Sequence, residues 1–188
     1  MSRILLSLAA FVLSLTSAQA SVVINETNFP DENLRNYASE YDEDGNGTLS
    51  DAELATITIS HAGGIRNLRG AEHVTTLKEL HLRGYSEEEL IQGIDPSMFP
   101  KLYRFTLGEC NGVTALDFSR NTMFETIELS RCSNVHALSL PTSVKEIQLY
   151  GAPKLTALDV SRLPNLIGLW LQHTGITDLD FSNHPAIQ

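Results

Sequence analysis

One apolar pattern recurs along residues 77–174. Five segments read apolar-x-x-apolar-x-apolar: LKELHLRGY (77–85), LYRFTLGEC (102–110), FETIELSRC (124–132), VKEIQLYGA (144–152) and LIGLWLQHT (166–174). Successive segments are offset by 20 to 25 residues, close to the period of leucine-rich repeats. The alternation predicts a short strand in each segment, and the period predicts that the strands stack in parallel. We therefore expect an α/β repeat solenoid, a short leucine-rich-repeat array with a parallel concave β-sheet.

A second phrase separates the predicted strands and is expected to form the convex return of each coil. It reads VTALDFSRNTM, VHALSLPTS, LTALDVSRLPNL and ITDLDFSNHPAI. The segment LATITISHAGGIRNLRG (54–70) resembles a degenerate first coil, so we assign the repeats to residues 57–188. The sequence ends part-way through a repeat, and solenoids need their terminal apolar edge covered. Either the chain is truncated or a partner covers this edge.

Alternation along each strand also predicts which side chains face outward from the sheet. Those with binding potential are His81, Arg83, Arg104, Glu128, Gln148, Tyr150, Trp170 and Gln172. Trp, Tyr and Arg are enriched in binding hot spots, which favours a partner-binding face. Alternatively, Trp170 packs against a neighbouring loop or covers the edge of the last coil.

The first twenty residues, MSRILLSLAAFVLSLTSAQA, have the three parts of a secretory signal peptide. Arg3 is followed by an apolar run and then by a small-x-small cleavage pattern that ends at Ala20. The apolar run is too short for a membrane anchor. We predict a secreted, periplasmic or cell-surface protein that is not inserted into a membrane.

The stretch DEDGNGTLSDAE, residues 42–53, matches an EF-hand calcium loop at each constrained position. Its predicted calcium ligands are Asp42, Asp44, Asn46, Thr48, Ser50 and Glu53. Gly47 occupies the position of the sharp bend, and Leu49 is expected to face the core. The alternative is an acidic surface turn, because Asp, Asn and Gly are common in turns without metal.

The flanks of this loop predict a helix before it and about one helical turn after it. Asn28 or Asp31 is a candidate helix cap, and apolar residues follow at helical spacing. Sensor EF-hands open a groove between full-length helices, which this sequence does not provide. We therefore predict that residues 21–56 form a cap in which calcium has a structural role.

The net charge and the missing catalytic motifs argue against two classes of function, nucleic-acid binding and catalysis. The formal net charge is −10, and within residues 21–53 the acids are concentrated while Arg35 is the only base. This balance argues against nucleic acid as a partner. The six histidines show no HExxH spacing, and no Gly-x-Ser-x-Gly motif is present. We predict no enzymatic activity.

The two cysteines, Cys110 and Cys132, occupy the same position of successive repeats and should be neighbours in the core. A disulfide is chemically allowed in an exported protein, but bridge geometry is demanding and buried thiols are ordinary core residues. We favour unbridged cysteines and leave the disulfide open.

The helix NFPDENLRNY, the loop and the repeats that contain LDVS or LDFS together resemble secreted bacterial leucine-rich-repeat proteins of the internalin type. The resemblance extends over nearly all of residues 24–188 and implies a surface or secreted binder of a class whose partners are diverse. It also implies that the six loop positions bind calcium. The sequence departs from the pattern in its small number of repeats and in lacking a carboxy-terminal anchor.

Two functions follow as hypotheses. The first is a calcium-braced repeat module that binds a protein through its concave sheet. The second is a structural or capping fragment that docks through its open carboxy-terminal edge. A glycan-binding module is a third reading, because an outward aromatic such as Trp170 can stack on a sugar.

Overall fold

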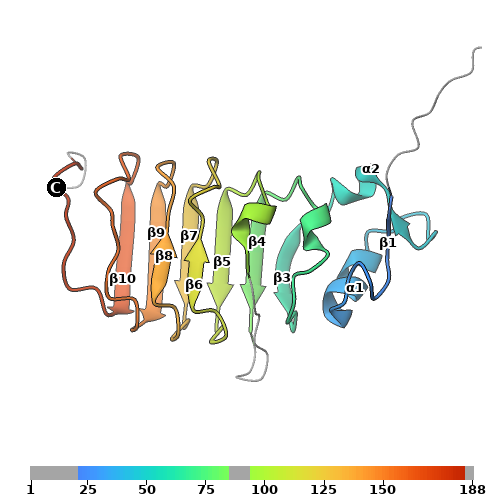
Figure 1. Ribbon diagram of the computed structural model, residues 1–188, viewed down its shortest axis with the longest axis horizontal. Helices are drawn as coiled ribbons and strands as arrows, with labels where there is room; N and C mark the ends of the chain where they lie inside the picture. The colour runs from blue at the N-terminus through green and yellow to red at the C-terminus, as the bar shows by residue number, and fades with distance from the viewer. Residues whose placement is uncertain (1–20, 85–93, 185–188) are drawn as a thin grey trace, which may run out of the picture.

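The computed structural model describes residues 21–84 and 94–184. The predicted signal peptide therefore lies outside the described residues, as do Tyr85 of the first strand segment and Ile187 at the end of the last return. The described chain forms a row of coils with a small cap at the amino-terminal end (Figure 1). Among the described helices, none is long and apolar enough to cross a membrane.

Six parallel strands form one face of the coils. In sheet order they are β10 (Gly168–Thr174), β9 (Glu146–Ala152), β7 (Thr126–Ser130), β5 (Arg104–Gly108), β4 (Glu79–Arg83) and β3 (Ile59–Gly63). Equivalent repeat positions pair directly, so that Leu82, Leu107, Leu129 and Leu149 align across four strands. The parallel order and register confirm the predicted repeat solenoid.

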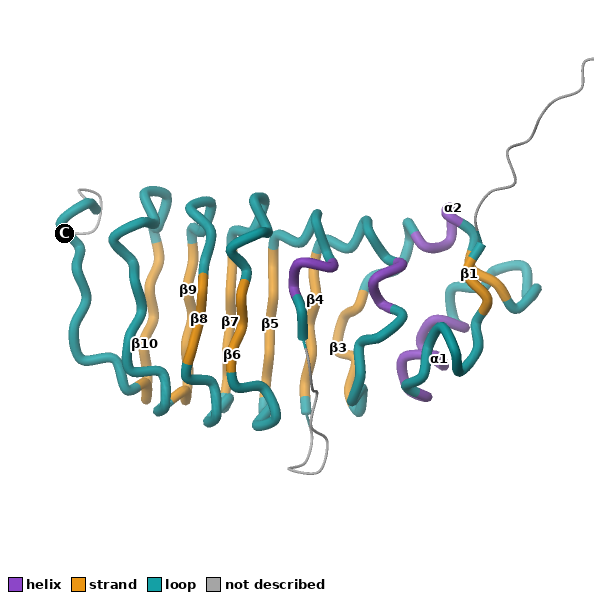
Figure 2. Tube along the Cα trace, in the orientation of Figure 1, coloured by secondary structure: helices purple, strands orange, loops and turns teal. Residues whose placement is uncertain are grey.

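The opposite face is built mostly of loops (Figure 2). It carries two short parallel strands, β6 (Ala115–Asp117) and β8 (Ala137–Ser139), and two 3₁₀ helices, η1 (Ala71–His73) and η2 (Pro96–Met98). The LDFS and LDVS phrases form its corners. In them an aspartate Oδ1 accepts a hydrogen bond from the backbone N–H of the serine two residues later, as in Asp117–Ser119 at 2.9 Å and Asp159–Ser161 at 3.1 Å.

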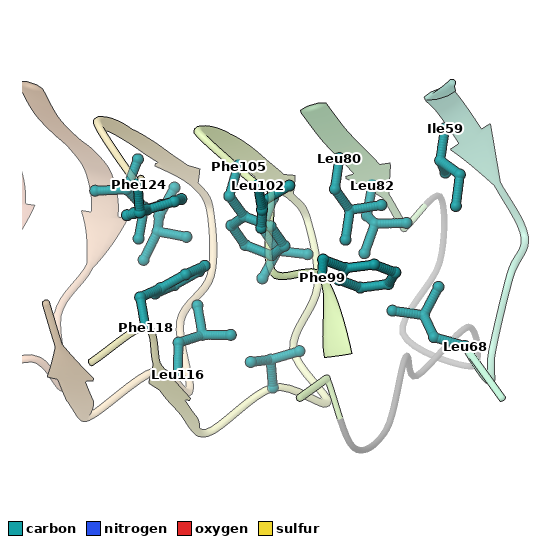
Figure 3. Packing of buried hydrophobic residues seen from close by; sticks show 14 of the residues in the cluster. Ile59, Leu68, Leu80, Leu82, Phe99, Leu102, Phe105, Leu116, Phe118 and Phe124 are labelled. Atoms are coloured by element: carbon teal, nitrogen blue, oxygen red, sulfur yellow. The ribbon is translucent and has the colours of Figure 1, made fainter. Parts of the chain in front are cut away.

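The core lies between the two faces and is a stack of aligned apolar side chains (Figure 3). At its centre the ring of Phe118, from a return, packs against two rings from the strand side. Its centroid is 5.2 Å from that of Phe105 and 4.1 Å from that of Phe124. Each coil therefore buries the apolar side chains of the coil before it.

The cap consists of β1 (Val22–Val23), α1 (Glu32–Ser39), β2 (Thr48–Leu49) and α2 (Asp51–Leu54). Of the two candidate helix caps, Asp31 is the one used, because its Oδ1 accepts a hydrogen bond from the N–H of Leu34 at 3.0 Å. The second helix is only four residues long and begins with a capping box between Ser50 and Glu53. This agrees with the single helical turn predicted after the loop.

Asp31 also ties the cap to the first coil. Its second carboxylate oxygen accepts hydrogen bonds from the backbone N–H groups of Arg66 at 2.8 Å and Asn67 at 3.1 Å. Nearby, Phe29 is buried against Gly70, where a Cβ would lie 2.5 Å from the phenylalanine ring. Gly70, with φ of 103°, thus permits both the backbone turn and the close approach of the cap.

Cys110 and Cys132 are both buried and unbridged. Burial raises the pKa of Cys110 to about 12 and that of Cys132 to about 11. Both are therefore neutral thiols at physiological pH and act as small core residues.

We expect the variant Phe118→Ala to lower the free energy of unfolding by about 3 to 5 kcal/mol, because it empties a fully buried ring site between two other rings. Urea denaturation measures this loss. The control is Met123→Ala, whose side chain is 58% exposed and whose removal should change stability by less than about 0.5 kcal/mol. Equal effects of the two variants would contradict the position assigned to Phe118.

Candidate functional site

The predicted calcium loop brings three carboxylates together. One oxygen from each of Asp42, Asp44 and Glu53 lies within 4.8 Å of the others. Asp42 and Glu53 are eleven positions apart in sequence, so the fold of the loop creates this cluster.

Internal hydrogen bonds fix the loop around these carboxylates. Asp42 accepts from the N–H of Asn46 at 3.1 Å and from that of Gly47 at 2.8 Å. The Oδ1 of Asn46 accepts from the N–H of Thr48 at 2.7 Å. The side chains of two predicted ligands, Asp42 and Asn46, are therefore bonded to the backbone within the loop.

Glu53 closes the loop from its far end. One carboxylate oxygen accepts from the N–H of Glu43 at 2.9 Å, and the other accepts from the N–H and hydroxyl of Ser50 at 2.8 and 2.7 Å. These bonds, those from Ser50 foremost, hold the pKa of Glu53 below its usual value. The group is thus anionic at neutral pH, which suits a bidentate carboxylate ligand of a cation.

The loop is attached to the core through Gly47 and Leu49. Gly47 has a φ of 78° and its carbonyl accepts from the N–H of Ile24 at 3.0 Å. Leu49 is fully buried and pairs with Val22 in the small antiparallel sheet. The oxygen-rich donor set and the bend at Gly47 fit a hard cation such as calcium. Calcium binding itself stays a prediction.

The predicted partner-binding residues lie on the outer face of the six-stranded sheet, in rows that run across the strands. One row contains His81, Thr106, Glu128, Gln148 and Trp170. A second contains Arg83, Gly108, Ser130, Tyr150 and Gln172, and Arg104 belongs to a third that begins at Glu79. The register therefore spreads the eight predicted residues over the whole face instead of gathering them in one pocket.

Trp170 lies at one end of this face, on β10. Its side chain is 44% exposed, and the six-membered ring lies directly over Gly168, where a Cβ would come within 2.6 Å of two ring carbons. The equivalent position on β9 is Glu146. Gly168 thus provides the space in which the ring rests on the strand while remaining accessible to solvent.

Glu109 is a charged group on this side of the coils that sequence reasoning missed. Its Oε1 accepts from Arg83 at 3.1 Å and from Arg131 at 2.9 Å, and so connects three successive coils. The two guanidinium groups, that of Arg83 first, hold the pKa of Glu109 below its usual value. All three side chains border a hollow of about 340 Å³ on the sheet face.

A repeated backbone conformation positions these groups. Glu109, Arg131 and His173 have φ of 56°, 54° and 54°, and the equivalent residue of the next coil after Arg131 is Gly151 with φ of 85°. Each of these residues directly follows a strand or is the last residue but one of it, at the point where the chain leaves the sheet for the loop on the opposite face. The signal available in sequence was weak, because this position holds glycine in two segments, as Gly84 and Gly151, and polar residues in the other three.

A second unpredicted network lies at the entry to β4. The hydroxyl of Tyr103 donates to Oε1 of Glu79, and Nε2 of His81 lies 3.2 Å from its other oxygen. The bond from Tyr103, followed by that to His81, lowers the pKa of Glu79, while the same carboxylate raises the pKa of Tyr103. The network links two neighbouring strands at the start of the outer face.

No protein-family model matches this sequence, and a search of curated proteins gives no significant match. Similar solved structures from Listeria monocytogenes include internalin C2, with 17% identity and a TM-score of 0.36, over 86% of this chain and 91% of that chain. Internalin InlF has 13% identity and a TM-score of 0.36, over 87% and 75% of the two chains.

A third similar structure from the same organism is the functional domain of InlJ, which includes a cysteine ladder. It has 13% identity and a TM-score of 0.31, over 89% of this chain and 74% of that chain. Similarity at this level concerns the fold alone. The strand register and the stacked core of the described residues establish that fold independently.

We expect Tyr103→Phe to raise the pKa of Glu79, because the variant removes the donor that most stabilises its anion. A depressed carboxyl pKa stabilises the fold above the ordinary value near about 4.3, and this stabilisation is lost as pH falls through the folded-state pKa. The variant should therefore be less stable than the wild type at neutral pH. Its free energy of unfolding should also change less with pH between the ordinary carboxyl pKa and the lowered pKa of Glu79 in the folded state. Carboxyl-detected NMR titration of Glu79 measures the shift, and Tyr150→Phe is the control. An unchanged Glu79 pKa would contradict the network.

Proposed function

We propose that this protein is a secreted repeat scaffold that binds a protein partner through the outer face of its six-stranded sheet. The observation that carries the proposal is the arrangement of that face: its polar and aromatic side chains stand in register across the strands, and Trp170 remains 44% exposed at one end. Trp170 is half-exposed and its ring rests on Gly168 of the same strand. Tryptophans in interfaces are among the residues that contribute most of the binding energy.

The chemistry of the face also favours a protein over a compact ligand. Arg83, Arg104, Tyr150 and Trp170 are distributed along several strands, so a partner must span several coils to contact them together. Charged groups of both signs, such as Arg104 and Glu128, share this face with the aromatic side chains, as at the rim of a protein interface. The predicted signal peptide supports secretion as part of the same proposal.

Calcium enters the proposal as a brace of the amino-terminal cap. The candidate ligands are Asp42, Asp44, Asn46, Thr48, Ser50 and Glu53. The loop that they form joins α1 to α2, and both helices bury side chains against the first coil. A helix of four residues after the loop gives no second arm for a sensor-type opening. Bound calcium would neutralise the clustered carboxylates and hold the loop closed.

Docking through the last described coil is the second candidate function. Leu169, Leu171, Ile176, Leu179 and Phe181 are only partly buried there, whereas Leu149 of the preceding strand is fully buried. Such a coil offers an apolar edge to another protein element.

A glycan ligand is a further alternative, since the exposed indole ring of Trp170 can stack on a sugar. Neither alternative requires Arg104.

We expect calcium to raise the thermal midpoint of the wild-type protein, because a ligand that binds only the native state stabilises it. Glu53→Gln should abolish most of this shift, since the neutral amide cannot act as a bidentate anionic ligand. The matched control is Glu43→Gln, which removes one negative charge from the same loop at a position without a ligand role. Differential scanning calorimetry with calcium and with a chelator measures both.

The control separates site binding from general charge screening. If Glu43→Gln and Glu53→Gln respond equally to calcium, or if the wild type does not respond, the loop is an acidic turn and calcium has no part in the function.

We expect a photo-crosslinking amino acid at Gln148 to yield a discrete adduct with a partner in extracts of neighbouring cells. The same group at Ala137, which is exposed on β8 of the opposite face, should yield none. Adding Trp170→Ala and Arg104→Ala should reduce the Gln148 adduct by at least about tenfold, as loss of a hot-spot anchor implies. Quantitative mass spectrometry of the adduct is the measurement. An adduct of equal yield from both positions, or one that survives the double variant, would contradict the proposed face.

A further inference from the structure

A cavity of about 630 Å³ lies at the junction of the cap and the sheet, where the chain enters strands β3, β4 and β5. Its walls come from the segment after α2, from the residues that lead into β4, and from Lys101 ahead of β5. The pairing of β3 with β4 is irregular here, with a register shift between Ile59 and Ala62. The size falls within the range of small-molecule sites in proteins.

The floor of the cavity is apolar. Ile57, Ile59 and Leu77 all line it, and all three belong to the buried core. The exposed Ala55 forms part of the wall on the cap side. A ligand that enters here would therefore place a hydrocarbon portion against the core and leave its other end at the rim.

The rim carries two lysines, Lys78 and Lys101. Within residues 21–84 and 94–184, neither ammonium group forms an ion pair or hydrogen bond. The acidic group at the rim is Glu79, and its two oxygens are occupied by Tyr103 and His81. The rim thus presents two cationic donors beside a carboxylate that already has partners, in a protein whose formal net charge is −10.

From the apolar floor and the two lysines at the rim we infer that this cavity binds a small amphiphilic carboxylate. Its aliphatic portion lies on Ile57 and Leu77, and its carboxylate accepts hydrogen bonds from Lys78 and Lys101. Neither lysine belongs to the face proposed to bind a protein partner. The cavity does share His81 with that face, so the two lysines, and not His81, are the residues whose substitution tests this site separately from partner binding.

Three eight-carbon probes test the inference: octanoate, 1-octanol and octylammonium, each below its aggregation concentration. Amide chemical shifts of ¹⁵N-labelled protein follow binding, and those of Ile57, Leu77 and His81 report on the cavity. Octanoate should bind tightest, about fivefold more tightly than octanol, as two exposed ion pairs of ordinary strength imply. This preference runs against the net charge of the protein, which by itself favours octylammonium.

Two variants locate the two parts of the ligand. Lys78→Gln with Lys101→Gln should weaken octanoate binding about fivefold and leave octanol binding unchanged. The matched control is Lys145→Gln with Lys154→Gln, which removes two lysine charges elsewhere and should change neither. Ala55→Phe should occupy part of the cavity and weaken all three probes, provided that its spectrum shows the native fold.

Three outcomes would overturn the inference. Equal binding of octanoate and octanol would show that the lysines do not select an anion. Shifts confined to residues outside the cavity would place the site elsewhere. Binding of the peptide acetyl-glycyl-leucine without any binding of octanoate would make the occupant a peptide terminus and not a free amphiphile.

Discussion

Every coil of this protein depends on the next one to cover its apolar edge. The inward side chains of a single strand and its return are too few to form a core, and burial is achieved only when equivalent positions stack in register. Phe118, packed between Phe105 and Phe124, shows this directly, since its ring contacts belong to successive coils. Among residues 21–84 and 94–184 no coil precedes the first one, and the cap covers it through Phe29, Leu34 and Leu49.

Much of the fold could be predicted because the repeat period and the alternation of apolar residues are local signals. The outward or inward direction of each strand residue follows from that alternation, as Leu80 and His81 illustrate. The sequence did not predict the left-handed residues Glu109 and Arg131, because most polar residues at a turn adopt other conformations. Nor did it predict that Asp31 bonds to both α1 and the first coil, since the second contact is 35 residues away.

The candidate sites also differ in whether they could be predicted from the local sequence. The loop at residues 42–53 is readable from sequence because its ligands are spaced along one continuous segment. The ion pairs of Glu109 with Arg83 and Arg131 join three coils. The hydrogen bond from Tyr103 to Glu79 joins the neighbouring strands β5 and β4 at their starts. The cavity beside Lys78 and Lys101 arises where the cap meets the sheet. These groups become neighbours only when the coils stack, and the sequence pattern does not show which side chains of neighbouring coils then bond to each other.

The cap completes the core of the first coil, and we propose that calcium braces this cap. Native-state hydrogen exchange tests it most directly, because it resolves local opening of the cap from opening of the inner coils. With calcium in place of a chelator, we predict slower exchange for the amides of Leu34, Ala38 and Ile59 and little change for Leu149 in β9. Identical exchange of the cap amides under both conditions would contradict the claim.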